Sequence, residues 1–426
     1  MIGIMILIHE LGHYWAARYF DVQIDSFSIG FGPRVFGFRR GETDFRISLI
    51  PLGGYVKMEG EQPTDAPTDD PRAFLNKPRY QRLIIAFAGP FMNIILAVGL
   101  LAGLYTTEFP KPMNGGQEGV IDLVRANSAA AKAGFQPGDR ITYIDGETNP
   151  TWEQIFIKVL SSPSRPIEVK FVRNGQPMSA TLTPETDPKD GVGFAGWSEQ
   201  SQFQIEGFPA TSDAKKQGLK PGDVLVAANG QPVRSINRLR EITRASGGEP
   251  VRIDYERNGN LMTATVTPTE GELDGKKTWL LGVQLGPRVE YVKLPVFEAI
   301  RESVATNLKG AGMIYGVLKN IIVARMSPKS LEGPIRIAQA SGDAARQGAS
   351  SFIGLMAAVS LNLALFNLLP IPVLDGGMIL LLLVEMVWRR DLSLNVKENV
   401  MKFGFVFLMM LVMFVLYNDI RKTIGG

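Results

Sequence analysis

The stretch MIGIMILIHELGHYWAARYF, residues 1–20, decides how the rest of the sequence is interpreted. Eight apolar residues precede a His-Glu-Leu-Gly-His cluster at 9–13, and apolar character then resumes with Tyr14, Trp15, Ala16 and Ala17. A secretory signal would end in a small-residue cleavage site, and no site of that form is present. We therefore expect residues 1–20 to form a membrane-spanning helix that carries functional polar groups.

The cluster His9-Glu10-Leu11-Gly12-His13 matches the H-E-x-x-H pattern of zinc peptidases. Residues i and i+4 project from one face of a helix, so both imidazoles can bind one zinc ion while Glu10 acts as the general base. A pattern of five residues can also arise by chance. His9 and His13 are the only histidines of the chain, however, and an unpaired ionisable group in an apolar helix is costly, so we favour the metal site.

Three further apolar runs, at residues 83–105, 351–369 and 403–417, are candidate spans, although the last is short and needs its apolar flanks. Basic residues concentrate in two connecting segments, which predicts that these segments are cytoplasmic and that the large middle region and both termini lie on the opposite side. These basic residues are Arg34, Arg39, Arg40, Arg46, Lys57, Arg72, Lys77, Arg79 and Arg82, and then Arg389, Arg390, Lys397 and Lys402.

The middle region contains an internal repeat, because AGFQPGD at 133–139 returns 84 residues later as QGLKPGD at 217–223. Asp-Gly at 145 matches Asn-Gly at 229, and Arg-Asn-Gly at 173 matches the same triplet at 257. Alternating strands, such as 167–172 and 251–255, are joined by Asn-Gly turns that favour hairpins. The pattern indicates tandem PDZ-like domains that capture peptide ends, or else domains that act only as spacers.

The first cytoplasmic segment is also predicted to be β-structure. Residues 34–38 and 44–50 flank a turn at Gly41, residues 51–56 end in a further strand, and residues 59–72 form a loop. A hairpin beside the zinc motif would present an edge to an extended substrate.

The third metal ligand is expected on another apolar helix, and Asp375 is the leading candidate because it follows the run 351–369. Pro370 and Pro372 break that helix and let the chain turn, and the glycines after Asp375 permit close backbone approach. The alternative is that Asp375 caps the apolar helix that starts at Met378, and the two roles are compatible.

Taken together, the motifs resemble those of the site-2 protease family of intramembrane zinc metalloproteases. The resemblance rests on the zinc motif, on NLLPIPVLDGG at 367–377, and on paired PDZ-like units between the second and third spans. FSIGFGP at 27–33, IPLGGYVKM at 50–58, Ala-Gly-Pro at 88–90 with Asn93, and Gly-Pro-Ile at 333–335 support it.

The resemblance implies a single zinc ion per chain held by His9, His13 and Asp375, with Glu10 as the catalytic base. Asn367 matches the substrate-binding asparagine of the family, and Asn362 is a weaker candidate for that role; both asparagines could instead join helices by hydrogen bonds. Pro370 and the hairpin are where we expect a substrate helix to unwind. The implied substrates are single-span membrane proteins, such as a trimmed anti-sigma factor or remnant signal peptides, cut in regulated intramembrane proteolysis.

The expected fold is therefore a polytopic α-helical membrane protein with about four spans, a cytoplasmic membrane-associated β-hairpin and two tandem PDZ-like α+β domains. We expect two spans in residues 1–110, PDZ-like domains at 111–195 and 196–286, and an amphipathic connecting region with the last two spans at 287–426. The resemblance places the chain in a bacterial inner membrane with its PDZ-like domains in the periplasm.

Other classes of protein explain less of the sequence. The net charge of +3 is too small to indicate a nucleic-acid partner, and the absence of cysteine excludes disulfides and thiolate ligands. A membrane-anchored PDZ adaptor would leave the zinc motif unexplained, a soluble peptidase would have no use for the spans, and no serine nucleophile motif is present.

Overall fold

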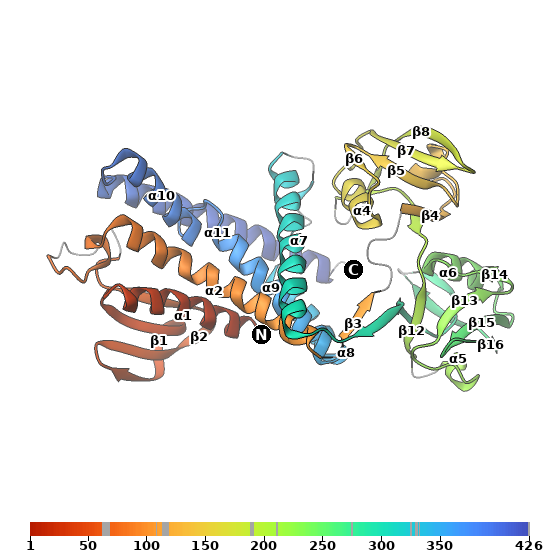
Figure 1. Ribbon diagram of the computed structural model, residues 1–426, viewed down its shortest axis with the longest axis horizontal. Helices are drawn as coiled ribbons and strands as arrows, with labels where there is room; N and C mark the ends of the chain where they lie inside the picture. The colour runs from red at the N-terminus through yellow and green to blue at the C-terminus, as the bar shows by residue number, and fades with distance from the viewer. Residues whose placement is uncertain are drawn as a thin grey trace. The chain divides into compact units, whose positions relative to one another are not determined.

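The computed structural model describes residues 1–61, 69–107, 109–112, 119–187, 191–209, 212–273, 276–323, 326–328, 331 and 333–424. The chain divides into two compact units (Figure 1). Unit 1 comprises Met1–Phe109, Lys293–Gly316 and Leu331–Gly426, and unit 2 comprises Pro110–Val292 and Val317–Ser330. The predicted loop at 59–72 lies in part outside the described residues, because 62–68 are not among them.

Long apolar helices dominate unit 1, as the sequence predicted. Within the described residues, three helices are long and apolar enough to cross a membrane, at Arg79–Tyr105, Ala349–Asn367 and Leu394–Arg421. The fourth predicted span corresponds to α1 (Ile2–Tyr19), which is not among these three because polar residues interrupt its apolar sequence. The other helices are α2 (Arg79–Tyr105), α7 (Val296–Ile322), α8 (Pro334–Gln347), α9 (Ala349–Asn367), α10 (Asp375–Trp388) and α11 (Leu394–Ile424), with a 3-10 turn at Phe74–Asn76.

The predicted hairpin is part of a larger structure, made of β1 (Ile24–Arg40) and β2 (Thr43–Met58). Phe27 pairs with both Phe45 and Val56, so each long strand bends and contributes two segments to one antiparallel sheet. The segments lie in the order 34–40, 43–48, 24–29 and 54–58. The expected pairing of 34–38 with 44–50 is present, but residues 24–29 form an additional inner strand that the sequence prediction missed. Residues 34–40 form one edge of this sheet and residues 54–58 form the other, which we call the outer strand; neither has a second neighbour among the strands of the described residues.

Helix α2 holds unit 1 together, because it packs against α1, α9 and α10. A Cβ atom on Gly12 of α1 would lie 2.3 Å from the carbonyl oxygen of Ala88, so only glycine permits α1 and α2 to cross this closely. The sheet also packs on α1, and Phe27 and Val56 of the sheet share one buried apolar cluster with Ala17 of α1 and Ile85 of α2. The zinc motif is thereby enclosed between a helix and a sheet.

A buried aspartate connects two helices of unit 1, α11 and α8. Asp419 of α11 is fully buried and accepts hydrogen bonds from the backbone amides of Gly333, Ile335 and Arg336 at 2.9, 3.1 and 3.4 Å. These amides belong to the first turn of α8, where backbone donors have no partner within the helix. The carboxylate therefore joins the end of α11 to the start of α8.

Unit 2 contains the two antiparallel sheet domains that the internal repeat predicted. Their strand orders correspond, with β8-β7-β5-β4-β11 in the first domain and β16-β15-β13-β12-β19 in the second. The Asn-Gly turns at Asn174 and Asn258 have the positive φ angles at both residues that tight hairpins require.

The first domain consists of β4 (Gly119–Val124), α3 (Ala129–Lys132), β5 (Arg140–Ile144), β6 (Glu147–Thr148), α4 (Trp152–Leu160), β7 (Ile167–Arg173), β8 (Gln176–Leu182), β9 (Glu185–Thr186), β10 (Gly193–Phe194) and β11 (Trp197–Glu199). The second consists of β12 (Phe203–Gly207), α5 (Asp213–Lys216), β13 (Val224–Ala228), β14 (Gln231–Pro232), α6 (Ile236–Ala245), β15 (Val251–Arg257), β16 (Asn260–Val266), β17 (Thr269–Leu273), β18 (Lys276–Leu280) and β19 (Gln284–Pro287). Two short strands, β3 (Phe109–Pro112) and β20 (Val289–Val292), flank them.

Both domains contain the same buried ion pair. Arg173 donates to the two carboxylate oxygens of Asp139 at 2.7 Å each, and Arg257 makes the same pair of contacts with Asp223. Asp139 and Asp223 are almost completely buried, and both also accept a backbone amide hydrogen. The repeat therefore conserves a polar core contact as well as the strand order.

Candidate metal centre

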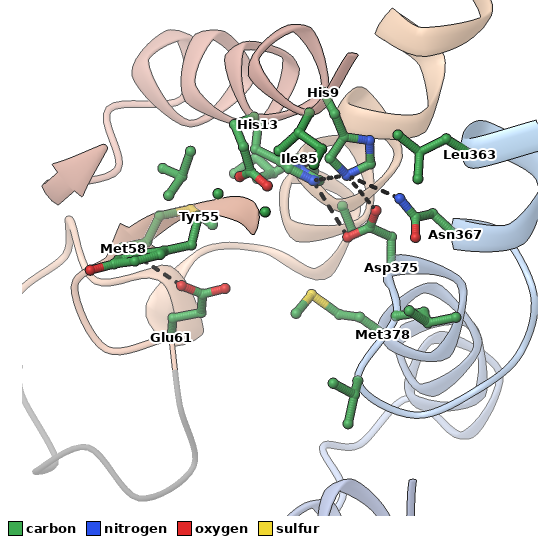
Figure 2. Close-up of a pocket in the computed structure, with 18 of the residues that line it drawn as sticks. His9, His13, Tyr55, Met58, Glu61, Ile85, Leu363, Asn367, Asp375 and Met378 are labelled. Atoms are coloured by element: carbon green, nitrogen blue, oxygen red, sulfur yellow. Dashed lines mark hydrogen bonds and ion pairs between the residues drawn. The ribbon is translucent and has the colours of Figure 1, made fainter. Parts of the chain in front are cut away.

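Helix α1 directs both histidines to one point inside the helical unit. His9 and His13 are buried, and their Nε2 atoms lie 3.2 Å apart (Figure 2). The spacing of one helical turn produces this convergence, as the motif predicted. The Nδ1 atom of His13 lies 2.8 Å from the carbonyl oxygen of Ile85, which can only accept, so His13 carries its proton on Nδ1 and presents the Nε2 lone pair.

Asp375 completes the cluster from the first residue of α10. Its Oδ2 atom is 3.1 Å from Nε2 of His9, and its Oδ1 atom is 3.4 Å from Nε2 of His13 (Figure 2). The alternative role as a helix cap is not what the structure has, because the N-cap position is Leu374 and no side chain caps the helix. The carboxylate is directed toward the imidazoles instead.

Close backbone packing around the turn before α10 makes this placement possible. A Cβ atom on Gly376 would lie 2.3 Å from the carbonyl oxygen of Leu368, and one on Gly377 would lie 2.3 Å from that of Ile371. Any side chain at either position would push α10 away from the end of α9. The two glycines therefore let the chain after α9 pack closely enough for Asp375 to lie beside the two histidines.

The three side chains fit a metal ion. One ligand atom from each of His9, His13 and Asp375 lies within 4.8 Å of the other two, and two imidazoles with one carboxylate are a common protein ligand set for zinc in catalytic sites. Two imidazole nitrogens that face each other across 3.2 Å are also hard to explain without a shared cation or proton. The donor set and its convergence therefore support the predicted ligands.

A cavity of about 390 Å³ opens beside this cluster and is lined by His9, His13, Asp375 and Glu10. Glu10 is half-buried and faces the outer strand of the sheet, where a Cβ atom on Gly54 would lie 3.3 Å from Cγ of Glu10. Tyr55 and Val56 of the same strand also line the cavity. A carboxylate, a candidate metal site and a sheet edge thus share one compartment.

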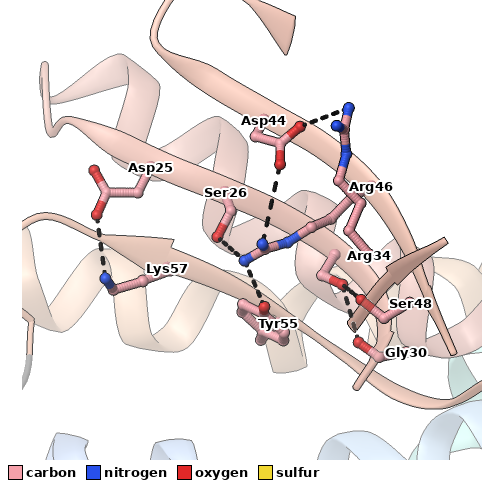
Figure 3. A network of polar contacts seen from close by, with 10 residues as sticks. Asp25, Ser26, Gly30, Arg34, Asp44, Arg46, Ser48, Tyr55 and Lys57 are labelled. Atoms are coloured by element: carbon pink, nitrogen blue, oxygen red, sulfur yellow. Dashed lines mark hydrogen bonds and ion pairs between the residues drawn. The ribbon is translucent and has the colours of Figure 1, made fainter. Parts of the chain in front are cut away.

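A polar network holds the sheet in shape next to the cavity (Figure 3). Arg46 donates to Ser26 Oγ at 2.9 Å and to the Tyr55 hydroxyl at 2.6 Å, and it also lies near Asp44. The Ser28 and Ser48 hydroxyl groups are 2.8 Å apart. These contacts join the outer strand to the inner strands, so Tyr55 has a fixed position at the cavity wall.

The three predicted substrate-binding residues occupy different surroundings. Asn367 lines the cavity, and its Nδ2 atom is 3.5 Å from Nε2 of His9. Asn362 is half-buried in α9 and Pro370 is exposed, and neither contributes to the cavity wall. The structure therefore brings Asn367 to the candidate metal centre and leaves Asn362 and Pro370 outside it.

Sequence reasoning missed the contribution of α2 to the site. A Cβ atom on Gly89 would lie 2.3 Å from Nε2 of His13 and 2.8 Å from Nε2 of His9, so a bare backbone is required beneath the imidazoles. Asn93 is completely buried, with its amide nitrogen 3.3 Å from Nδ1 of His9. Both residues belong to the Ala-Gly-Pro and Asn93 motif, which the sequence offered only as part of a family pattern.

A second cavity of about 980 Å³ adjoins the first, and Tyr55, Asp375 and Met378 line both. A buried ion cluster lies in its wall: Glu385 of α10 is 3.7 Å from Arg82 of α2 and 2.6 Å from Lys397 of α11. Asp391 is 3.3 Å from the same Arg82 guanidinium. Three helices therefore meet at one group of charges.

The surroundings of Asp391 affect its acidity. Partial burial favours the neutral acid, but hydrogen bonding from Arg79 and the charge of Arg82 outweigh this effect and lower the pKa of the Asp391 carboxyl below its usual value. Asp391 is therefore ionised at neutral pH and contributes a negative charge to the cluster.

Comparison with known proteins identifies the family. The model of peptidase family M50 matches residues 1–411. The regulator of sigma-E protease RseP of Salmonella typhimurium is 31% identical over 99% of this chain and 97% of its own length, and that of Escherichia coli is 30% identical with the same coverage. The regulator of sigma E protease of Haemophilus influenzae is 31% identical, again over 99% and 97%.

Among solved structures, the PDZ domain of an SdrC-like protein from Listeria monocytogenes has 18% identity and covers 21% of this chain and 90% of its own, at a TM-score of 0.18. That score is too low to carry an argument about the fold. The full-length family match and the convergence of the H-E-x-x-H histidines with a carboxylate lead to one conclusion: the chain is a metalloprotease that belongs to peptidase family M50.

Proposed function

We propose that the protein is a zinc-dependent intramembrane endopeptidase that cuts single-span membrane proteins. The observation that carries this proposal is the convergence of His9, His13 and Asp375 at a cavity within a unit of long apolar helices, with Glu10 on the same cavity wall. A soluble peptidase would need the three ligands and the base but not the apolar helices.

His9, His13 and Asp375 would hold one zinc ion through two Nε2 atoms and a carboxylate oxygen. When bound, zinc acts as a Lewis acid toward the scissile carbonyl and lowers the pKa of water to about 7. Glu10 accepts the proton of the attacking water and then delivers it to the leaving amine. The half-buried position of Glu10 on the cavity wall suits both transfers, because little bulk water competes there.

Substrate binding as an extended strand is supported by the outer strand of the sheet. Residues 54–58 lie at the cavity and pair with residues 24–29 on one side only, within the described residues. A peptide bond in a membrane helix is hydrogen-bonded and shielded, so the substrate must unwind before water can attack. Pairing with this strand would replace the lost helical hydrogen bonds, and Asn367 would donate to the substrate backbone.

This part of the proposal predicts that helix stability in the substrate controls the rate. Replacement of helix-breaking residues in a cleaved span by leucine should slow cleavage, because more helical hydrogen bonds must be broken. Equal rates for both substrates would contradict the unwinding step.

The relatives and the sheet domains support the proposed substrate class. The relatives named regulator of sigma-E protease cover 99% of this chain, which supports a trimmed anti-sigma factor as substrate, and remnant signal peptides as further ones. The two sheet domains of unit 2 would bind peptide ends or restrict access by size. The basic residues near one end of α2, α10 and α11 support an orientation with those domains in the periplasm, and the bacterial relatives support an inner membrane location.

The decisive test compares cleavage of a trimmed single-span reporter by wild type, Glu10→Gln and Glu298→Gln, with zinc content measured for all three. Glu298 is an exposed glutamate of α7, outside the cavity, and serves as the matched control. We expect about one zinc ion in each protein and loss of cleavage in Glu10→Gln alone. If wild type neither holds zinc nor cuts, the protein is instead a membrane-anchored adaptor whose sheet domains carry its function.

A further inference from the structure

Asn93 is a buried amide with a single side-chain contact. It lies on α2, is 0% exposed, and places its Nδ2 atom 3.3 Å from Nδ1 of His9. Its Oδ1 atom is buried with no hydrogen-bond partner among the described residues. A buried amide oxygen without a partner is costly, so its placement needs an explanation.

The two imidazoles of the site have different partners for Nδ1. His13 donates from Nδ1 to the Ile85 carbonyl oxygen, a group that can only accept, and this leaves its Nε2 free for a metal. His9 faces Asn93, which has both a donor and an acceptor. Ile85 therefore determines which ring nitrogen of His13 carries the proton, whereas Asn93 is compatible with a proton on either ring nitrogen of His9.

The amide of Asn93 can serve two states of His9. With Nδ2 toward the ring, as the structure has it, Nδ1 of His9 accepts and the proton lies on Nε2, where the Asp375 carboxylate at 3.1 Å can accept it. If the amide is turned over, Oδ1 accepts from Nδ1–H and Nε2 becomes a lone pair directed at the cluster. The oxygen and nitrogen of an amide occupy nearly the same space, so this turn changes no packing.

We propose that Asn93 is a positioning residue for the metal: its side-chain carbonyl accepts a hydrogen bond from Nδ1–H of His9 and fixes the tautomer that presents Nε2 as a ligand. The inference rests on the proposed zinc site. It extends that site to a fourth residue, which touches neither metal nor substrate. Partners of this kind orient metal-binding histidines and raise their basicity.

The neighbouring contacts hold Asn93 where this role requires it. Ile85, Gly89 and Asn93 are spaced four residues apart and share one face of α2, the face that meets both imidazoles. Ser360 of α9 donates to the backbone carbonyl of Asn93 at 2.9 Å. Contacts from α1 and α9 therefore meet at Asn93: His9 at the side-chain amide and Ser360 at the backbone.

The test uses the presence of only two histidines in the chain. Enzyme labelled with ¹⁵N-histidine gives separate ring signals for His9 and His13 in nuclear magnetic resonance. In zinc-loaded wild type we expect a hydrogen-bonded Nδ1–H on both rings. In Asn93→Leu the His9 Nδ1–H signal should shift or exchange away while the His13 signal, whose partner is a backbone carbonyl, stays unchanged.

Zinc affinity provides the second readout, measured by competition with a chelator. Asn93→Leu should bind zinc about 10- to 100-fold more weakly than wild type, and Asn93→Asp, which retains an acceptor, should recover most of the affinity. Asn307→Leu is the control, because Asn307 is a buried asparagine of α7 whose side-chain nitrogen donates to Ser303 of the same helix.

Two results would overturn the inference. One is an unchanged His9 signal in Asn93→Leu, and the other is a loss of affinity in Asn307→Leu equal to that in Asn93→Leu. Failure of the proposed function is distinguishable, since wild type itself would then hold no zinc. If Asn93→Leu does not fold, the Asn93→Asp spectrum decides, because an acceptor alone must keep the proton on Nδ1 of His9.

Discussion

Replacement of Gly89 by alanine separates the stability of the helices from the integrity of the metal site. The new Cβ atom would lie 2.3 Å from Nε2 of His13, whereas an unstrained contact needs about 3.5 Å. The imidazole must therefore move by roughly 1 Å, several times the ~0.2 Å tolerance of a metal–ligand bond. We expect zinc affinity to fall at least about 100-fold, the upper end of what changes around a metal shell produce.

The fold should survive this change, because alanine favours a helix over glycine by up to ~1 kcal/mol. Gly99→Ala is the matched control, since Gly99 lies in the same helix and a Cβ there has nothing within 4 Å. Thermal unfolding in detergent and zinc content should be measured for both variants. The reasoning is refuted if Gly89→Ala retains wild-type zinc affinity, or if Gly99→Ala loses it to the same extent.

Three further outcomes follow from these contacts. Glu385→Gln should destabilise the helical unit by ~3–5 kcal/mol, because it removes the buried carboxylate that faces both Lys397 and Arg82 and leaves Lys397 without its ion-pair partner among the described residues. Glu398→Gln, from a largely exposed pair with Lys402, should change unfolding by less than ~1 kcal/mol. Asp139→Asn should cost about 3 kcal/mol, seen as faster hydrogen exchange in the first sheet domain, while Glu185→Gln at the exposed Lys132 pair should leave exchange unchanged. Removal of the metal by a chelator should lower the unfolding temperature, and added zinc should restore it in wild type but not in His9→Ala; restoration in that variant would contradict the assigned ligand.

The arrangement of the candidate ligands could be predicted from the sequence to a large extent. The spacing of His9 and His13 determines a shared direction in any helix, so the convergence of their Nε2 atoms needed no tertiary information. Asp375 was harder, because an aspartate at the start of an apolar helix has two ordinary roles. Only the tertiary contact with the imidazoles distinguishes them, and the structure has that contact.

The parts that escaped prediction depend on long-range packing. Gly89 and Asn93 belong to an apolar helix whose sequence pattern says nothing about which face meets α1. The inner strand at 24–29 was missed because the glycines near it indicate turns, and its partners at 44–47 and 54–58 are both needed to recognise it. The Asn-Gly turns of the repeat were predicted correctly because a local φ requirement determines them.

One backbone amide of the outer strand already has a hydrogen-bond partner within the chain. The backbone amide of Met58 donates to the Glu61 carboxylate at 3.2 Å, and Glu61 lines both cavities. If a substrate pairs along residues 54–58 as proposed, it would need that same amide, so Glu61 would compete with it at the end of the strand. A segment that forms several backbone hydrogen bonds in a row would replace the Glu61 contact more readily than a side chain that forms one.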